Sequence, residues 1–315
     1  MKIIPIQEAY QRKFERQKQI AGLEYHAAGH CVHVGRLSPG CLSCFIPDPF
    51  RANILAGTRC NLHCVYCVNR IEEEPARLDR IRTKAAFLKE ARLPQYSPKS
   101  ISFSGGGEPL LYVDVIAGYM EILNGIFAGK GNRPWFHVYT NGLLATEDAL
   151  LRLRDLGIDE IRFHLGASDF SKKVYRHLRK ASGLFKTISV ETPAWPPHRK
   201  KLFEMLSRLD DHGVKHLNLG EIEITPYNYG RIAKALPGAE IYPCYEMHLY
   251  DEGLTYDLME EVVRRNYCFS ILDCSCFVKS IQRGEAKFVD HEDVTALVAG
   301  VPGPGTQGRV HSEGA

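Results

Sequence analysis

Three cysteines lie within eight residues of one another in the stretch CNLHCVYC, at Cys60, Cys64 and Cys67. A structural zinc ion takes four protein ligands, and His63 lies inside the loop without the usual ligand spacing. A [4Fe–4S] cluster also takes one outside ligand for each of its four irons. Three thiolates leave one iron open, so the pattern indicates a cluster whose open iron binds a substrate or cosubstrate.

The same stretch resembles the signature of the radical S-adenosylmethionine (SAM) superfamily, including the aromatic Tyr66 before the third cysteine. The resemblance implies that the amino and carboxylate groups of SAM chelate the open iron. It also implies that an electron from the cluster, supplied by a donor such as flavodoxin or ferredoxin, cleaves SAM to methionine and a 5′-deoxyadenosyl radical. That radical then abstracts a hydrogen atom from the substrate.

A second stretch, SGGGEP at 104–109, resembles the GGEP motif of this superfamily, whose backbone groups hydrogen-bond the methionine amine of SAM. Glycine lets the main chain approach a ligand closely, and proline stiffens the exit from a turn. An ordinary strand-to-helix turn is the alternative. Because both motifs follow successive predicted strands in the family's order, we interpret this one as a SAM-binding loop formed by Gly105, Gly106, Gly107, Glu108 and Pro109.

Polar residues after three later strands extend the resemblance. Thr140 and Asn141 begin a TNG sequence like that of pyruvate formate-lyase activating enzymes. Ser168 ends the fourth strand and Glu191 the fifth, where the family contacts the ribose, the methionine carboxylate or the adenine. Each of these residues is predicted to bind SAM, with a role in a cap or turn as the alternative.

Seven further cysteines fall in two groups, and the long stretch between Cys67 and Cys244 contains none. Auxiliary Fe–S clusters occur in many radical SAM enzymes, although the spacings here differ from those of the SPASM domain. The residues predicted to ligate one or more auxiliary clusters are Cys31, Cys41, Cys44, Cys244, Cys268 and Cys274. We predict that Cys276 is a free thiol that donates a hydrogen atom to a product radical.

Two arrangements of these cysteines stay open. Each group builds its own cluster, or the two ends of the chain meet on one side of the barrel and share a single cluster. Cys274 and Cys276 face the same side only if the chain between them is extended. Zinc bound by the N-terminal group is a third reading.

The sixth predicted strand, His216–Glu223, ends in two carboxylates. By parity, Glu221 and Glu223 share one face with Leu217 and Leu219. An inner face at a strand end meets the ligand, so these carboxylates are predicted to be catalytic, in substrate binding or proton transfer. A solvated outer face, or pairing with a nearby arginine, is the alternative.

The elements that position these residues alternate between strands and helices. The strands are predicted at Asn53–Gly57, Ser100–Ser104, Trp135–Tyr139, Glu160–Leu165, Thr187–Glu191 and His216–Glu223, and the helices at Arg80–Ala91, Val113–Phe127, Glu147–Leu156 and His198–His212. Repeated βαβ units form a parallel sheet with active residues at the carboxyl ends of its strands. The predicted fold is an α/β partial (β/α)6 radical SAM barrel.

Composition sets the broad class of the protein. The 315 residues, 44% hydrophobic and 24% charged, are typical of a globular chain, and a net charge of +3 gives no reason to expect nucleic acid as a partner. Without a run of 18 apolar residues or a signal peptide, we predict a cytoplasmic protein with no membrane partner, whose cysteines are ligands rather than disulfides. We divide it into an N-terminal cysteine-containing cap (1–50), the barrel (51–235), a C-terminal cysteine-rich extension (236–295) and a disordered tail (296–315).

The sequence therefore predicts a radical SAM enzyme acting on a small-molecule substrate by oxidation, epimerisation or rearrangement. Three alternatives remain. A glycyl-radical-enzyme activase is suggested by Cys67-Val-Asn69-Arg70 and by the TNG sequence. A peptide-modifying maturase fits by class, but 50 residues before the barrel are few for a peptide-recognition domain. A non-enzymatic Fe–S electron-transfer protein would not need SGGGEP.

Overall fold

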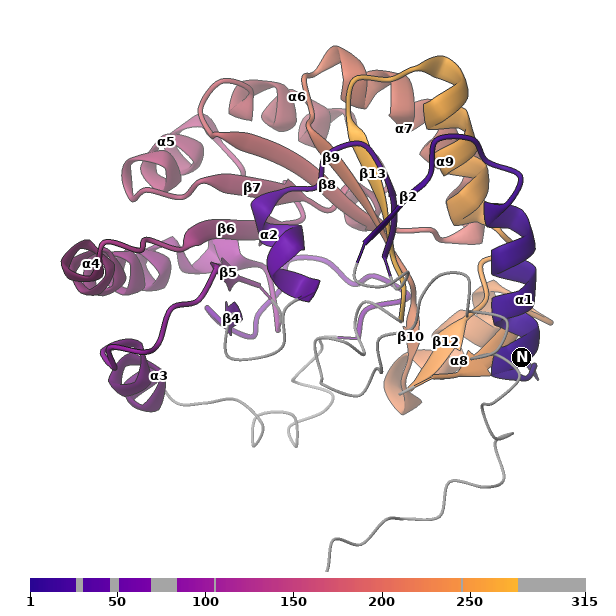
Figure 1. The fold of residues 1–315 in the computed structure, drawn as a ribbon, viewed down its shortest axis with the longest axis horizontal. Helices are drawn as coiled ribbons and strands as arrows, with labels where there is room; N and C mark the ends of the chain where they lie inside the picture. The colour runs from indigo at the N-terminus through magenta and orange to yellow at the C-terminus, as the bar shows by residue number, and fades with distance from the viewer. Residues whose placement is uncertain (27–30, 46–50, 69–83, 105, 245, 277–315) are drawn as a thin grey trace, which may run out of the picture.

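The computed structural model describes residues 1–26, 31–45, 51–68, 84–104, 106–244 and 246–276. Within these residues, one sheet has the strand order β2-β3-β13-β9-β8-β7-β6-β5-β4 (Figure 1). The strands from β4 to β9, and then β13, are parallel neighbours, whereas β3 pairs with β13 and with β2 in antiparallel fashion. The bounds are β2 (Glu24–His26), β3 (Cys31–Val34), β4 (Arg51–Ile54), β5 (Ser100–Phe103), β6 (Trp135–Thr140), β7 (Glu160–Phe163), β8 (Thr187–Pro193), β9 (His216–Gly220) and β13 (Ser270–Cys274).

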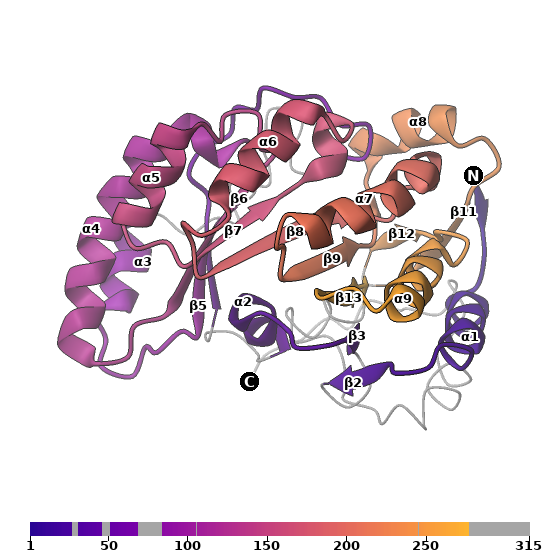
Figure 2. The same ribbon diagram turned by 90° about the horizontal axis from the view of Figure 1, so that it is seen from above.

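The helices that connect the parallel strands cover one face of this sheet. Each strand from β4 to β9 lies beside the next one in sequence, so the connections all run in the same direction and place their helices on the same side. Figures 1 and 2 show this outer layer curving around the sheet. It consists of α3 (Lys84–Ala91), α4 (Val113–Lys130), α5 (Glu147–Asp155), α6 (Lys172–Ala181), α7 (Arg199–Asp211) and α9 (Leu254–Arg265). The predicted α/β partial (β/α)6 barrel is confirmed, and β13 adds a seventh parallel strand to it.

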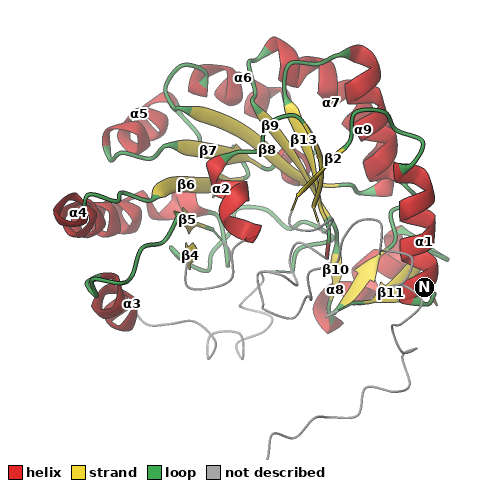
Figure 3. Ribbon diagram, in the orientation of Figure 1, coloured by secondary structure: helices red, strands yellow, loops and turns green. Residues whose placement is uncertain are grey.

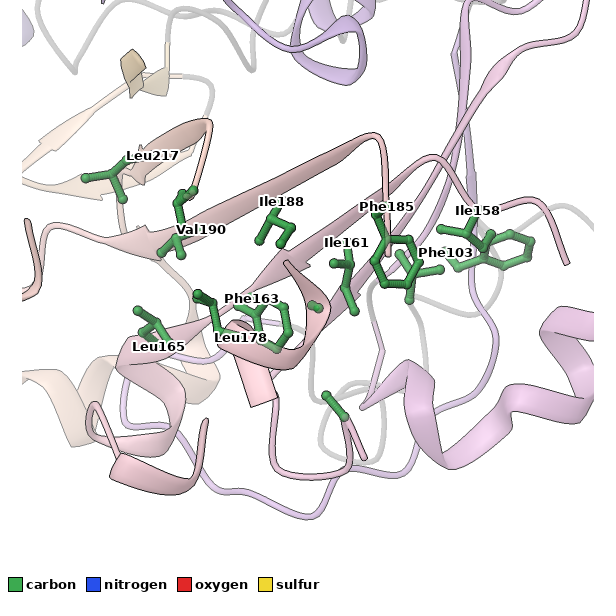
Figure 4. Packing of buried hydrophobic residues seen from close by; sticks show 14 of the residues in the cluster. Phe103, Ile158, Ile161, Phe163, Leu165, Leu178, Phe185, Ile188, Val190 and Leu217 are labelled. Atoms are coloured by element: carbon green, nitrogen blue, oxygen red, sulfur yellow. The ribbon is translucent and has the colours of Figure 1, made fainter. Parts of the chain in front are cut away.

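The hydrophobic core lies between the sheet and the outer helices. Alternate residues of the strands point to this side, among them Phe103, Phe163 and Val190, and Leu178 of α6 packs against them (Figure 4). All four side chains are buried. Burial of such side chains removes apolar surface from water and is the main force that holds the helices on the sheet.

The opposite, inner face of the sheet is polar. Residues that alternate with the core positions are buried there without facing the helices: Ser102, His137, Glu160, Arg162, Ser189 and Asn218. Buried polar groups are tolerated only when they are hydrogen-bonded. The inner face therefore depends on the network described next.

Arg162 of β7 connects this inner face. Its Nε donates to Glu160 at 2.8 Å, and its Nη1 donates to the Tyr139 hydroxyl at 3.2 Å and to Glu191 at 3.1 Å. Its Nη2 donates to the Ser38 hydroxyl at 2.9 Å, which brings in the N-terminal segment. Burial alone would raise the pKa of Glu160, but Arg162, His137 and the hydrogen bonds from Ser189 and Trp135 together outweigh it, and the pKa falls from 4.5 to about 2.

The N-terminal residues and a later excursion complete the structure. A four-stranded sheet has the order β1-β11-β12-β10, and α2 lies on the inner side of the main sheet (Figure 3). The remaining elements are β1 (Lys2–Ile3), α1 (Ile6–Gln17), α2 (Pro39–Leu42), η1 (Ser43–Phe45), η3 (Pro109–Tyr112), η4 (Leu165–Ser168), η5 (Pro196–His198), β10 (Glu223–Ile224), α8 (Pro226–Ala235), β11 (Glu240–Pro243) and β12 (Met247–Leu249). Because β1 joins β11 and β3 joins β13, both predicted end segments share sheets with other parts of the chain.

The sixth predicted strand is wrong in its second half. The structure ends β9 at Gly220 and places Glu223 in β10, which pairs with β12 in the other sheet. At the break, the Glu221 N–H donates to the Cys274 carbonyl at 3.2 Å. The prediction that Glu221 and Glu223 share one face of a single strand is therefore wrong, because the chain passes from one sheet to the other between them. The first residues of the helix predicted at Arg80–Ala91, and the predicted tail, lie outside the described residues.

One helical segment of the described chain, Pro109–Lys130, is long and apolar enough by length and composition to cross a membrane. Its Ile116, Met120, Leu123 and Phe127 are buried in the core against the sheet. This packing is typical of the core helix of a globular domain.

Arg162→Met is expected to lower the free energy of unfolding by about 3 to 5 kcal/mol, because it leaves the buried Glu160 carboxylate without its cation. Urea denaturation measures this change. Arg152, whose ion pair with Asp114 is exposed, provides the matched control, and Arg152→Met is expected to change stability by less than about 1 kcal/mol. Equal effects of the two substitutions would show that the inner-face network does not stabilise the fold.

The same carboxylate predicts a pH dependence. The folded pKa of Glu160 lies below its ordinary value, so its contribution to stability is complete above about pH 4.5 and is lost as the pH falls towards 2. Without the Arg162 guanidinium, burial raises the pKa of Glu160 instead. The stability difference between wild type and Arg162→Met, followed by urea denaturation from pH 6 to pH 3, should therefore become smaller in acid. A constant difference would contradict this assignment.

Candidate active site

The loop that carries Cys60, Cys64 and Cys67 follows β4, at the carboxyl edge of the parallel strands. Cys60 is exposed, and the other two cysteines are partly exposed. The Cys67 N–H donates to the Cys64 carbonyl at 3.2 Å, which closes a turn between them. All three thiols therefore have access to solvent at the edge where a βα sheet binds its ligands.

Tyr66 anchors this loop to the neighbouring strand ends. Its buried ring stacks on His164 with the ring centroids 5.9 Å apart, and the edge of Trp195 approaches it at 5.6 Å. Its hydroxyl has no hydrogen-bond partner in the part of the chain that the structure describes. A Cβ added at Gly166 would lie 2.5 Å from the Thr192 hydroxyl oxygen and 3.0 Å from that of Tyr66, so only a glycine allows this close packing. Tyr66 thus holds the loop against the neighbouring strand ends.

Glu108 of the SGGGEP loop joins two successive loops of the edge. Its buried carboxylate accepts from the Thr140 hydroxyl at 2.6 Å, from the Asn141 N–H at 2.7 Å and from the Leu110 N–H at 3.1 Å. Burial raises the pKa of Glu108, and these three donors partly offset it. The side chains of Glu108 and Thr140, both predicted to bind SAM, hydrogen-bond each other within the protein and position the loops.

Asn141 connects the same junction to the cysteine loop. Its Nδ2 donates to Asn61 Oδ1 at 2.6 Å and lies 4.0 Å from the Cys60 sulfur, while its Oδ1 accepts from the Leu143 N–H at 3.0 Å. The loops after β4, β5 and β6 are therefore held together by Glu108 and Asn141. Of the predicted SAM-binding residues, Asn141 lies beside a cysteine of the motif.

A close backbone approach fixes the spacing of the first two loops. The Glu108 N–H donates to the Arg59 carbonyl at 2.9 Å, and a Cβ at Gly107 would overlap that carbonyl. Tyr112 supports the other side, because its hydroxyl accepts from the Arg59 N–H at 2.8 Å. Gly107 is thus required by protein packing, and Gly106, at a φ of +73°, has the left-handed backbone that glycine adopts readily. Gly105 lies outside the described residues, and Pro109 begins η3.

Ser168 and Glu191 have internal partners. The Ser168 hydroxyl donates to the Leu165 carbonyl at 3.1 Å within its own turn. Glu191 accepts from Arg162 and from Asn218 Nδ2, each at 3.1 Å, and its side chain is 29% exposed. Ser168 therefore serves its turn, whereas Glu191 belongs to the inner-face network and still reaches solvent.

The two carboxylates predicted to act together are separate. Glu221 is buried and pairs with Lys13 of α1, and it also accepts from the Tyr242 hydroxyl and, at 2.8 Å, from the Cys276 N–H. Burial would raise the pKa of Glu221, but Lys13, His248 and the Tyr242 hydroxyl together outweigh it, and the pKa falls to about 2. Glu223 is buried in β10. Pairing with an arginine was the alternative to a catalytic role for Glu221. The structure shows such an ion pair, but its cation is Lys13.

The other seven cysteines divide into three places. Cys31, Cys41, Cys44 and Cys274 pack together on the inner side of the sheet. Cys244 and Cys276 pack with Tyr10 and Tyr242 near the small sheet, and Cys276 is fully buried there. Cys268 is exposed before the start of β13, where its N–H donates to Asp210, so the structure does not bring it to the other cysteines.

Several residues that shape this site carry no motif. His164 and Trp195 hold Tyr66, Tyr112 supports Arg59, and Arg162 orders the inner face. Arg162 had a visible signal, since it alternates with apolar residues in a strand that is otherwise buried. The others are distant in sequence from what they contact, and no local pattern would have identified them.

The residues at this edge fit a [4Fe–4S] cluster and SAM. The donor set is three cysteines that are exposed or partly exposed, and the buried Tyr66 hydroxyl beside them has no partner among the described residues. No group of three or more His, Cys, Asp or Glu side chains among the described residues could hold a single metal ion. A cubane cluster lies between its thiolates and separates them more widely than one zinc ion does.

Comparisons with known proteins agree with this geometry. Residues 54–188 match the family model described as the Radical SAM superfamily. A Methanocaldococcus jannaschii protein that carries the provisional name of a glycyl-radical enzyme activating enzyme, MJ0021, is 25% identical over 190 residues, which are 56% of this chain and 48% of that protein. The uncharacterized protein MJ0804 of the same organism is 31% identical over 120 residues, 38% of this chain and 35% of that protein. The chain thus spans about half or less of the length of these relatives.

Among solved structures, the chain is similar to Streptococcus suis SuiB bound to S-adenosylmethionine, with a TM-score of 0.49 and 13% identity, covering 78% of this chain and 54% of SuiB. It is also similar to anSMEcpe with bound AdoMet and the Kp18Cys peptide, with a TM-score of 0.46 and 15% identity, covering 71% of this chain and 63% of that one.

Gly107→Ala is expected to lower the free energy of unfolding by about 1 to 3 kcal/mol, because its Cβ overlaps the Arg59 carbonyl and both loops must shift. Gly118 of α4 is the control: a Cβ there meets nothing within 4 Å, and Gly118→Ala is expected to stabilise the helix by about 0.5 to 1 kcal/mol. Urea denaturation of both variants measures the two effects. A neutral Gly107→Ala would show that the loops are not held at this spacing.

Proposed function

We propose a function that proceeds from one fact, that the chain carries a radical SAM superfamily domain over residues 54–188. The protein binds a [4Fe–4S] cluster through Cys60, Cys64 and Cys67 and binds SAM beside it. It then abstracts a hydrogen atom from a small-molecule substrate for oxidation, epimerisation or rearrangement. The observation that carries this proposal is the junction in which Glu108 and Asn141 hold the loops after β4, β5 and β6 around the cysteine motif.

The chain's own residues have distinct roles in this proposal. The three thiolates hold the cluster, and the backbone of Gly106 and Gly107 offers polar groups to the methionine part of SAM. Glu108 is a positioning residue, because its two oxygens are already occupied by three internal donors. Bound there, the cluster supplies the electron that cleaves SAM to methionine and a 5′-deoxyadenosyl radical.

The substrate binds on the inner side of the sheet, next to the carboxyl ends of the strands. Support comes from Glu191, which is held by Arg162 and remains partly exposed, so that a polar substrate would find an oriented carboxylate there. The described N-terminal residues pair with the two sheets, and we take the substrate of this site to be a small molecule.

The protein would receive its electron from an external one-electron donor of the flavodoxin or ferredoxin class, because the cluster must be reduced before each cleavage. We also propose a cytoplasmic location, where thiols stay reduced and can serve as ligands.

A second candidate function is the activation of a glycyl-radical enzyme. The relative MJ0021 carries that name. In addition, Asn141 of the TNG sequence hydrogen-bonds Asn61 in the cysteine loop. In that case the hydrogen atom would come from a glycine of a partner protein. A glycyl-radical EPR signal on a co-purifying protein, after incubation with SAM and reductant, would favour this function over the small-molecule one.

The triple variant Cys60→Ala/Cys64→Ala/Cys67→Ala tests the proposed function. After anaerobic reconstitution it should contain about four fewer irons per chain than wild type, because one [4Fe–4S] cluster is missing. With dithionite and SAM, wild type should form 5′-deoxyadenosine, measured by liquid chromatography, and the triple variant should form none above background.

Cys268→Ala is the matched control, since Cys268 is also exposed but lies away from the other cysteines. It should keep the iron content and the 5′-deoxyadenosine yield of wild type. Full iron retention in the triple variant, or no 5′-deoxyadenosine from reduced wild type, would overturn the proposal.

A further inference from the structure

Two cysteines from opposite ends of the chain lie side by side on the inner face of the sheet. Cys31 is the first residue of β3, and Cys274 is the last residue of β13. These strands are antiparallel, with Leu272 opposite His33 and Asp273 opposite Val32, so the next step of the register brings Cys274 alongside Cys31. Cys31 packs with Leu272, and Cys274 packs against the same cluster, which places both thiols on one face.

Two more cysteines join them from the short helix α2 and the turn η1 that follows it. The Ser38 hydroxyl caps this helix by accepting from the Cys41 N–H at 3.2 Å, and Pro39 begins it. Three residues apart on helical turns, Cys41 and Cys44 project to the same side. Cys41 is buried with Cys31, and Cys44 packs against both of them. The Ser43 hydroxyl lies 2.5 Å from the Ser100 hydroxyl and fixes the segment to β5.

The surroundings of Cys41 suit an anionic sulfur ligand. Asn218 Nδ2 donates to the Cys41 sulfur at 3.2 Å. The Arg162 guanidinium lies directly beneath the helix, since a Cβ at Gly40 would come within 2.5 Å of its Nη2. A positive charge and an N–H donor both stabilise thiolate and cluster sulfur. The glycine at position 40 allows the helix to sit this close to the charge.

From this arrangement we propose that Cys31, Cys41, Cys44 and Cys274 ligate a second [4Fe–4S] cluster, closed by four thiolates. It goes beyond the proposed SAM chemistry and does not depend on it. With a thiolate for every iron, this cluster has no open position for SAM or substrate, so it exchanges single electrons without binding either. Of the two arrangements that the sequence left open, this is the one in which the chain ends meet and share a cluster.

Cys244 and Cys276 are too far from this group of four cysteines to be its ligands, because they belong to a different buried cluster. Cys244 and Cys276 lie near the Tyr10 hydroxyl, at 3.6 and 3.4 Å, in a separate buried group beside the small sheet. The extended strand β13 ends at Cys274, and Cys276 already has helical backbone. The two side chains therefore lie in different clusters, Cys274 with Cys31 and Cys276 with Tyr10.

Iron, sulfide and zinc analysis of the anaerobically reconstituted protein tests the assignment with two matched double variants. Wild type should hold about eight irons and eight sulfides per chain. Cys44→Ala/Cys274→Ala removes two partly buried thiols of the proposed site and should lose about four of each. Cys244→Ala/Cys268→Ala removes two thiols outside it and should lose none. Circular dichroism establishes that both variants are folded.

Three results would overturn the second cluster: unchanged iron in Cys44→Ala/Cys274→Ala, equal iron loss in the control double variant, or loss of one zinc ion in place of iron. If Cys44→Ala/Cys274→Ala does not fold, Cys44→Ser replaces it. This single change at a partly buried position should alter the EPR spectrum of the reduced second cluster, and an unchanged spectrum would also overturn the assignment.

EPR spectroscopy of the reduced Cys60→Ala/Cys64→Ala/Cys67→Ala variant separates this proposal from the proposed function. A [4Fe–4S] signal should remain in that variant, and added SAM should leave it unchanged because no iron is open. A signal that shifts with SAM would show an open iron and contradict ligation by four thiolates. Loss of SAM cleavage with this signal intact would leave the two proposals supported independently.

Discussion

The buried guanidinium of Arg162 is the interaction on which the inner half of this molecule depends. A charge can stay in a protein interior only when it is paired and its hydrogen-bond donors are used. Here Glu160 and Glu191 provide the opposite charge, and the hydroxyls of Tyr139 and Ser38 accept the remaining bonds. These partners come from β6, β7, β8 and the N-terminal segment, so this side chain helps to set how the segment sits on the sheet.

The carboxyl edge is organised in a similar way by a buried anion. Glu108 accepts hydrogen bonds from two loops and gives the reactive edge its shape without needing to touch a ligand itself. Arg162 lies inside the sheet and Glu108 at its edge, and each makes several hydrogen bonds within the protein. Groups held by several partners reorganise little when a ligand binds, and the loops that they hold remain in place.

Sequence patterns predicted the parts of this structure that are local. The five strands from β4 to β8 and the barrel architecture follow from the alternation of β-branched runs with amphipathic segments. The CNLHCVYC and SGGGEP loops lie at the expected strand ends. What could not be predicted depends on pairing across the chain. The end of β9 at Gly220 is set by β10 pairing with β12, and the partner of Glu221 is Lys13, about 200 residues earlier.

The pairing of β3 with β13 also has a consequence for how the molecule forms. Residues about 240 positions apart must meet before this strip of sheet exists, and loop closure over such a length is slow to nucleate. On the ribosome, the chain leaves the exit tunnel from its N-terminus, so the first strands of the barrel can fold while β3 still lacks its neighbour. Docking of the N-terminal strand is therefore a late event, because it must wait until β13 has been synthesised.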